Sequence, residues 1–145
     1  MLHPNRFQDE HLTLTNFQQE VLVVCPTCSK KAIAKVDFDT KLARLICAAC
    51  GCNKETSIAI RNGCFTMAAN FYFQAELWLK MSFKNELFWA YNDKHLDYLK
   101  RYISATLREH KDRTGFTLLE KLPKFYHEAK NREGMLKIIE KLKNK

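Results

Sequence analysis

The spacing of apolar residues along this 145-residue chain changes near residue 92. Before that point, apolar side chains recur at every second position, as in the run Leu77, Leu79, Met81 and Phe83. A period of two is typical of a half-buried strand, whereas spacings of three and four residues indicate an amphipathic helix. After residue 92 the helical spacing takes over. The pattern therefore predicts an α+β fold with an antiparallel sheet followed by helices.

The predicted strands fall between residues 12 and 91, and residues 20–91 are expected to form one extended antiparallel sheet. Asn62-Gly63 is a strong signal for a tight hairpin, and Lys84-Asn85 is a plausible second turn. The runs with alternating or β-branched character are residues 12–15, 21–24, 32–38, 42–46, 56–60, 64–67, 77–83 and 87–91.

About three helices are predicted after residue 92. The first follows Asn92 as an N-cap and runs to about His110. The second begins after Thr117 and is kinked or interrupted by Pro123. The last follows Asn131 as an N-cap and continues to the C-terminal lysines. No linker separates residues 1–92 from the helical part, residues 93–145, so we expect the helices to pack on the sheet as one compact body.

Two Cys-x-x-Cys pairs stand at the ends of the predicted strand pair 32–46. The pairs are Cys25 with Cys28 and Cys47 with Cys50, and 18 residues separate them. This spacing is typical of a single tetrahedral zinc site, and the order of turn, strand, strand and turn is that of a zinc ribbon. Four protein ligands close such a site to water, so we expect one structural Zn²⁺. Gly51 suits the turn after the second pair, whereas Ser29 at the matching position predicts a more strained or differently shaped first turn.

Other interpretations of the cysteines remain open at this stage. Two separate redox dithiols would require each Cys-x-x-Cys to open a helix, but the intervening residues are predicted strands. Iron could occupy the same thiolate cage instead of zinc. Cys52 and Cys64 are interpreted as spare thiols. An enzyme with a reactive thiol is the third hypothesis. A reactive Cys64 would need a neighbouring histidine and an orienting group, and the sequence alone identifies neither.

The composition makes the chain basic. The formal net charge is +8, of which residues 76–145 contribute +6. A basic chain favours acidic partners, with nucleic acid first among them. The lysines of the last predicted helices alternate with glutamates, however, as on an ordinary solvated helix face. The N-terminus lacks the pattern of a signal peptide and no apolar run is long enough to cross a membrane, so we expect a cytoplasmic protein without membrane association.

Aromatic residues are concentrated between residues 71 and 91. Trp78 and Phe88 lie close in sequence to Lys80 and Lys84. Rings beside lysines could stack on unpaired bases while the ammonium groups contact phosphates. The alternative is that these rings form the core between sheet and helices.

Residues 21–52, with their four cysteines, resemble the zinc ribbons of transcription factors and other nucleic-acid machinery. A longer resemblance, covering most of the chain, is to a family of small bacterial zinc-ribbon proteins with no assigned activity. It implies a fold and no function. Members carry a Cys-Cys-Gly turn where this chain has Phe83-Lys84-Asn85, so any role of that turn is missing here. The resemblance rests on Leu77-Trp78-Leu79, Trp89-Ala90-Tyr91-Asn92, His95-Leu96, Leu99, Tyr102-Ile103, Leu107-Arg108-Glu109, Leu122-Pro123-Lys124 and Ala129-Lys130-Asn131-Arg132-Glu133.

Together these observations predict a non-catalytic zinc-binding module. Its leading predicted partner is nucleic acid, bound through Lys80, Lys84, Trp78 and Phe88. The alternative is a protein-interaction subunit of a larger complex.

Overall fold

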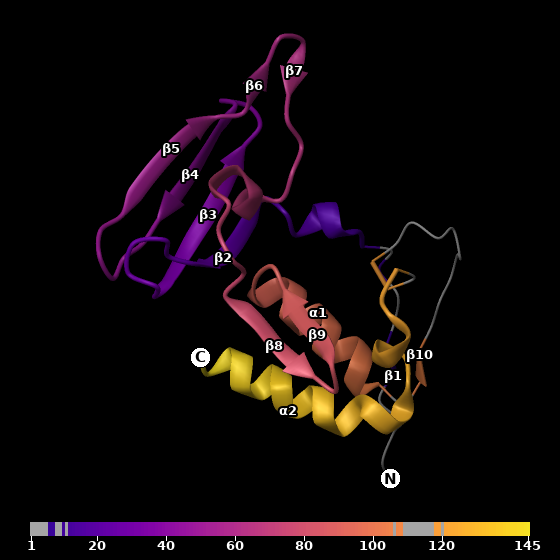
Figure 1. Cartoon of the computed structure of the whole chain (residues 1–145). Helices are drawn as coiled ribbons and strands as arrows, with labels where there is room; N and C mark the ends of the chain where they lie inside the picture. The colour runs from indigo at the N-terminus through magenta and orange to yellow at the C-terminus, as the bar shows by residue number, and fades with distance from the viewer. Residues whose placement is uncertain (1–5, 8–9, 11, 106, 109–117, 120) are drawn as a thin grey trace. The chain divides into compact units, whose positions relative to one another are not determined.

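The computed structural model describes residues 6–7, 10, 12–105, 107–108, 118–119 and 121–145. The chain divides into two compact units (Figure 1). The sheet unit comprises residues 17–80 and 89–92, and the helical unit comprises residues 1–16, 81–88 and 93–145. Residues 1–16 and 81–88 thus fall with the helices in this division, although the sequence pattern groups them with the sheet.

The sheet unit is built on four antiparallel strands in the order β2-β3-β4-β5. The strands are β2 (Glu20–Val24), β3 (Lys31–Asp37), β4 (Leu42–Ile46) and β5 (Asn53–Ser57). The predicted antiparallel sheet is confirmed over this range. On β3 and β4, Ile33 lies opposite Ile46 and Lys35 lies opposite Arg44. β5 forms one edge of the sheet.

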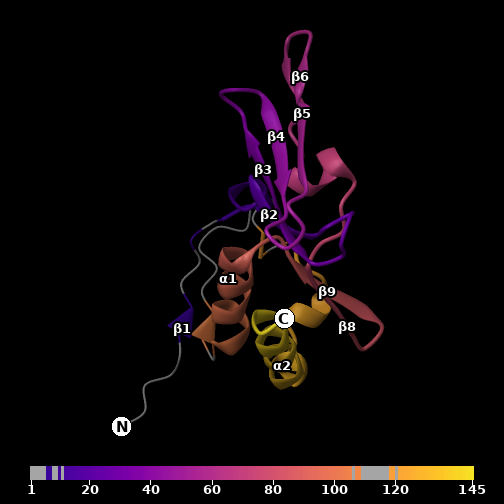
Figure 2. The ribbon, with the colours of Figure 1, turned by 90° about the vertical axis from the view of Figure 1, so that its left-hand side faces the viewer.

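The two faces of this sheet differ in the way that a period of two requires. One face is buried and includes Val21, Val23 and Leu45. It also carries Ala32, Ala34 and Ala43, and these small side chains let the 3₁₀ helix η2 (Ala69–Phe73) pack against β2, β3 and β4 (Figure 2). The opposite face, called here the outer face, presents half-buried and exposed side chains on β3, β4 and β5, whereas Leu22 of β2, which lies opposite Ile33, is buried.

The extended single sheet predicted for residues 20–91 is wrong beyond β5. A hairpin does form near the predicted Asn62-Gly63 turn, but its strands have only two residues, β6 (Ala59–Ile60) and β7 (Gly63–Cys64). Gly63 pairs with Ile60, so the turn residues are Arg61 and Asn62. Residues 65–67 leave the strand because the Tyr72 hydroxyl donates to the Phe65 carbonyl at 2.5 Å and accepts from the Met67 N–H at 3.0 Å. β8 (Leu79–Phe83) and β9 (Glu86–Ala90) form a separate hairpin around the predicted Lys84-Asn85 turn.

The predicted strand at residues 12–15 is also wrong. Residues Leu14–Asn16 form the 3₁₀ helix η1 instead. The Asn16 side-chain oxygen accepts hydrogen bonds from the Thr13 N–H at 2.7 Å and from the Thr13 hydroxyl at 3.1 Å. Such local side-chain bonds favour a turn over an extended strand.

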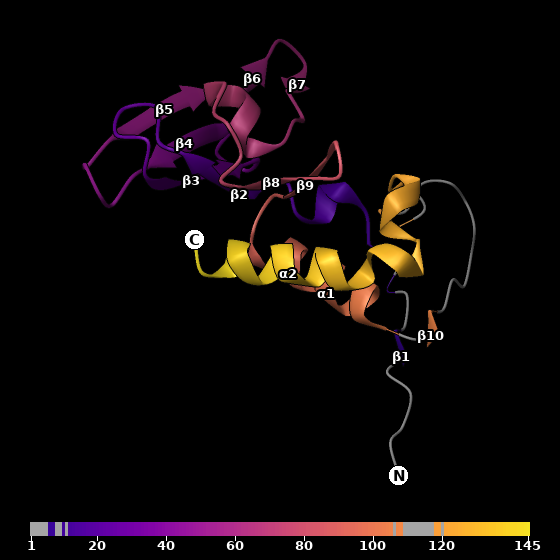
Figure 3. The same ribbon diagram turned by 60° about the horizontal axis from the view of Figure 1, so that its bottom comes forward.

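Two α-helices, not about three, lie in the described part of residues 93–145. They are α1 (Asp93–Ser104) and α2 (Arg132–Lys143), and they pack against each other (Figure 3). The described helical segments between them are the 3₁₀ turns η3 (Lys124–Tyr126) and η4 (Ala129–Asn131). Pro123 precedes η3 in an extended conformation, and a proline keeps the residue before it out of the α region. Thr117, the predicted start of the middle helix, lies outside the described residues.

The first helix also ends earlier than the sequence predicts. After Ser104, residues Leu107–Arg108 form β10, which pairs in parallel with β1 (Arg6–Phe7). His110, the predicted helix end, lies outside the described residues. Asn131 does occupy the N-cap position of α2, but its side chain makes no capping bond. Its Nδ2 donates to the Phe125 carbonyl and its Oδ1 accepts from Lys84 Nζ at 2.9 Å.

Aromatic rings fill the core of the helical unit. Phe83 stacks on Phe125 with ring centroids 6.0 Å apart, and Phe88 stacks on Tyr126 at 5.3 Å. His95 on α1 is buried with them, and loss of water lowers its pKa to about 4, so its ring is neutral at pH 7. The alternative interpretation of the aromatic segment as core therefore applies to Phe83 and Phe88.

We expect Gly134→Ala to destabilise the protein by about 1–2 kcal/mol, because overpacking outweighs helix propensity at this position. A Cβ added at Gly134 would lie 2.7 Å from Cε2 of Phe83, whose ring is buried and stacked on Phe125. Urea denaturation measures the effect, with Glu140→Ala on the exposed face of α2 as the control. A gain in stability would contradict the close packing of Phe83 on α2.

Candidate metal centre

The first Cys-x-x-Cys forms a tight turn between β2 and β3. The Ser29 N–H donates to the Cys25 carbonyl at 2.9 Å, and the Cys25 N–H donates to the Lys30 carbonyl at 2.7 Å. The Thr27 N–H points at Cys25 Sγ at 3.4 Å. Backbone donors directed at a sulfur stabilise its thiolate form, which is the form that binds metals.

The second Cys-x-x-Cys repeats this turn between β4 and β5. The Gly51 N–H donates to the Cys47 carbonyl and the Cys47 N–H donates to the Cys52 carbonyl, both at 2.9 Å. Gly51 has φ of 77° and Ser29 has φ of 64°, so both turns use a left-handed residue at the same place. The first turn is therefore not shaped differently from the second, because Ser29 adopts the conformation that glycine favours.

We expect Ser29→Gly to stabilise the protein by about 0.5–1 kcal/mol, since the left-handed conformation costs a serine energy that glycine does not pay. The exposed Ser29 side chain makes no hydrogen bond among the described residues that this change would remove. Thermal denaturation of the metal-loaded protein measures the gain, and Gly51→Ser is the reciprocal control with the opposite expected sign. A loss of stability in Ser29→Gly would show that the serine is needed for another reason.

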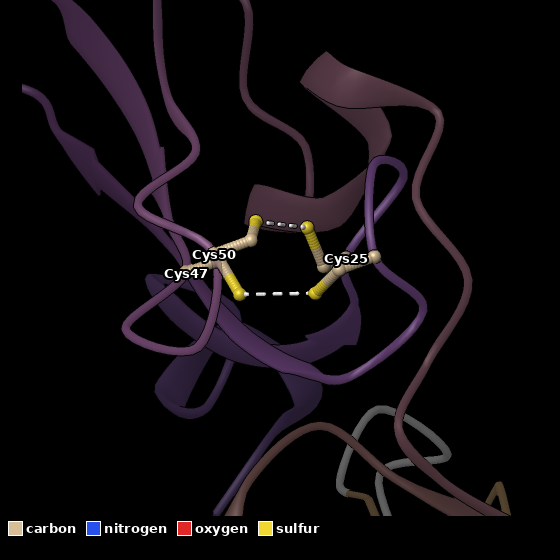
Figure 4. Close-up of side chains that lie close together, drawn as sticks. Cys25, Cys47 and Cys50 are labelled. Atoms are coloured by element: carbon tan, nitrogen blue, oxygen red, sulfur yellow. Dashed lines mark hydrogen bonds between the residues drawn. The ribbon is translucent and has the colours of Figure 1, made fainter.

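The two turns bring all four predicted sulfurs together (Figure 4). Cys25 Sγ lies 3.7 Å from Cys50 Sγ, and Cys28 Sγ lies 3.5 Å from Cys47 Sγ. All four sulfurs lie within 4.8 Å of one another. A tetrahedral zinc with bonds of roughly 2.3 Å places its sulfurs about 3.8 Å apart, so the observed spacing fits such an ion. Both of these contacts join one turn to the other, which favours one shared site over two separate dithiols.

The pKa values of these neighbouring thiols differ from one another. Hydrogen bonds from the backbone of Cys28 and, more weakly, Thr27 lower the pKa of Cys25 to about 6. The Cys52 backbone lowers the pKa of Cys50, but loss of water and the three neighbouring thiols outweigh it and raise that pKa to about 12. The cluster can therefore hold one thiolate easily but cannot hold four without a cation. A bound divalent metal supplies the missing positive charge.

The other two cysteines lie outside this cluster. Cys52 is half-buried, and the Thr27 hydroxyl points to its sulfur at 3.5 Å. Cys64 is half-buried in β7, opposite Ala59 of β6. Neither sulfur is part of the four-sulfur set, as the sequence spacing predicts.

The residues predicted to bind nucleic acid are divided between the two compact units. Trp78 and Lys80 belong to the sheet unit, whereas Lys84 and Phe88 belong to the helical unit. Phe88 is 0% exposed, so its ring cannot stack on a base and this assignment is corrected. Lys84 donates to Asn131 within its own unit. Lys80 forms an ion pair with Glu76 at 3.4 Å, and Trp78 is half-buried.

Two other surface features were not singled out by the sequence. Phe65 and Phe71 are 55% and 58% exposed. Phe65 lies in the predicted strand 64–67, whereas no strand was predicted at Phe71. Ile46 is 44% exposed on the outer face of the sheet, beside three basic side chains. The sequence did contain a sign of this second feature. Ile33 and Ile46 occupy the alternate positions of their strands, on the opposite face from the buried residues.

No protein-family model, curated protein or solved structure matches the chain. The resemblance to a bacterial zinc-ribbon family thus stays a prediction, and the four-cysteine site is supported by its own geometry. Among the described residues, no helix is both long and apolar enough to cross a membrane.

Proposed function

We propose that this protein is a non-catalytic binding module whose sheet unit is held together by one structural Zn²⁺. The observation that carries this proposal is the set of four cysteine sulfurs within 4.8 Å of one another, supplied by two matching turns. Thiolate ligands in a tetrahedral set are typical of zinc, and iron is the main competitor for the same donors.

The site is proposed to be structural because the chain itself provides four ligands. A catalytic zinc keeps one position open for water or substrate, and a tetrahedral Cys₄ site has none. The turns also join β2 to β3 and β4 to β5, so the metal ties together the ends of all four strands. Its contribution is therefore to folding, and activity must come from the surfaces that the sheet displays.

Metal content tests this proposal directly. The purified chain should contain about one zinc per molecule by elemental analysis, and Cys47→Ala should lose it. Cys52→Ala is the matched control, because Cys52 lies next to the site without belonging to it. Iron in place of zinc would correct the metal, and full zinc retention by Cys47→Ala would overturn the site.

For the partner, we propose another protein ahead of nucleic acid. One of the two rings predicted to stack on bases, Phe88, is buried. Exposed apolar side chains on the sheet unit, such as Ile46 and Phe71, are instead typical of surfaces that bind proteins.

Nucleic acid remains the second candidate because the net charge is +8. Phosphate binding of this origin weakens steeply as salt is raised, since bound counterions are released. Fluorescence anisotropy with labelled single-stranded and duplex DNA at low and physiological salt tests it. Tight binding with a steep salt dependence would put nucleic acid first, and the absence of binding at low salt would remove it.

A further inference from the structure

The outer face of the four-stranded sheet contains a shallow groove with a volume of about 290 Å³. Within the sheet unit this face lies opposite the one that η2 covers. The groove is lined by side chains of β3, β4 and the second cysteine turn, namely Lys31, Ile33, Lys35, Arg44, Ile46 and Ala48.

The floor of the groove is aliphatic. Ile33 and Ile46 lie directly opposite each other on β3 and β4, so their side chains share one patch. Ala48 lies between the metal-ligand positions Cys47 and Cys50 and lines the same groove. The groove therefore includes part of the turn that the metal holds.

The walls of the groove are basic, and no carboxylate lines it. Lys35 and Arg44 lie opposite each other beyond the isoleucines, while Lys31 lies on the other side of Ile33. Glu20 and Glu55 on the neighbouring strands pair with Lys35 and Arg44. Exposed pairs of this kind are weak, so they leave the cations available to a ligand. Among the described residues, Lys31 has no ion-pair partner.

The spacing of these groups has a period of two. Along β3, Lys31 and Lys35 each lie two residues from Ile33, which places each lysine position about 7 Å from the apolar centre. An extended peptide has the same repeat. A peptide with one apolar residue and an acidic residue two positions to either side therefore matches the groove in both spacing and charge.

We propose that this groove docks an extended acidic segment of a partner protein, with an apolar side chain on Ile33 and Ile46 and carboxylates on the flanking cations. This inference rests on the proposed function, because the metal-held turn forms one end of the groove. The charged residues that line the groove, Lys31, Lys35 and Arg44, are all basic, and this charge complementarity favours an acidic occupant.

The same face is poorly suited to a nucleic-acid strand. Its aliphatic floor offers no ring on which a base could stack. Glu20, Asp37 and Glu55 occupy the outer positions of β2, β3 and β5, so a continuous row of phosphates would meet carboxylates as well as cations. A short acidic segment can place its charges over the basic positions alone.

Selection from a displayed library of random peptides of about 12 residues, on the zinc-loaded full chain, tests the proposal. Enriched peptides should carry an apolar residue with an acidic residue two positions away on one or both sides. In fluorescence anisotropy, Lys31→Glu and Ile46→Ser should each weaken binding of an enriched peptide about tenfold or more. The matched control is Lys54→Glu, which makes the same charge change on β5 opposite the buried Leu45 and should change affinity less than about twofold.

Three outcomes would overturn the proposal. The selection could enrich no acidic and apolar pattern, or the groove variants could bind the peptide as tightly as the unaltered chain. Alternatively, the chain could bind a single strand of about 20 nucleotides and lose that binding in Lys31→Glu, which would assign the groove to nucleic acid.

The zinc content of every variant separates this proposal from the proposed function. A chain that holds one zinc but fails these peptide tests refutes the groove alone, whereas a chain without bound metal refutes the metal-held module. Lys31→Gln replaces Lys31→Glu if the charge reversal itself releases zinc. A lysine placed at the matching acidic position of the peptide should restore binding to Lys31→Glu, and failure of this exchange would count against the assigned contact.

Discussion

Chelation of the metal at pH 7 is expected to unfold the sheet unit. Binding of a structural zinc by a small domain contributes about 10–16 kcal/mol of apparent free energy, more than the total stability of most domains. The four cysteines occupy both turns that join β2 to β3 and β4 to β5. Loss of the ion should therefore remove the link between the two turns. The amide signals of β2–β5 should then lose their chemical-shift dispersion in an NMR spectrum.

Added Zn²⁺ should restore these signals and Mg²⁺ should not, because thiolates prefer soft metals. Rebinding at pH 7 should also release protons, because the thiols of an unfolded chain have pKa values of about 8.5 and bind the metal only as thiolates. Protons compete with zinc for the sulfurs, so zinc affinity should fall as the pH falls. Calorimetry in two buffers with different ionisation enthalpies measures the release. An unchanged spectrum after verified loss of metal would contradict a structural site.

Phe88→Ala is expected to destabilise the helical unit by about 3–5 kcal/mol, the usual range for deleting a buried aromatic ring. Phe88 is 0% exposed, and its ring stacks on Tyr126 at 5.3 Å. Removal of the ring leaves a cavity among side chains that cannot fully collapse into it. Urea denaturation followed by fluorescence and circular dichroism measures the loss.

The adjacent residue provides the control. Leu87 lies on the same strand and is 51% exposed, so Leu87→Ala should change the stability by less than about 0.5 kcal/mol. The comparison also separates the two sequence-based interpretations of Phe88. A base-stacking residue would lose nucleic-acid affinity with little change in stability, whereas a core residue shows the reverse. Equal, small stability effects of both substitutions would contradict the packing described here.

The metal site could be predicted because residues close together in the sequence determine its structure. Each Cys-x-x-Cys turn closes through hydrogen bonds within a few residues, and the strand pair between the turns brings them together. The Lys84-Asn85 turn was predicted for the same reason, and both of its residues have positive φ. The hairpin near Asn62-Gly63 was also predicted, although its turn residues are Arg61 and Asn62.

The features that the sequence did not predict depend on distant contacts. The sequence predicted no element for residues 69–73, where η2 packs on an alanine-rich sheet face and the Tyr72 hydroxyl bonds to the backbone seven and five residues earlier. The parallel pairing of β1 with β10 joins residues about one hundred positions apart. For Phe88, a period of two shows which residues share a face, but it does not show which face another element will cover.

The composition of the edge strand β5 has a consequence for self-association. A free edge offers unpaired backbone groups to a second copy of the chain, and continued pairing of this kind leads to fibres. β5 presents Lys54 and Glu55 at adjacent positions and contains no large apolar residue. A second copy aligned on this edge would have to bring charged side chains together without an apolar surface to bury. The strand is thus a poor template for aggregation, even though no strand of the described residues pairs with its outer side.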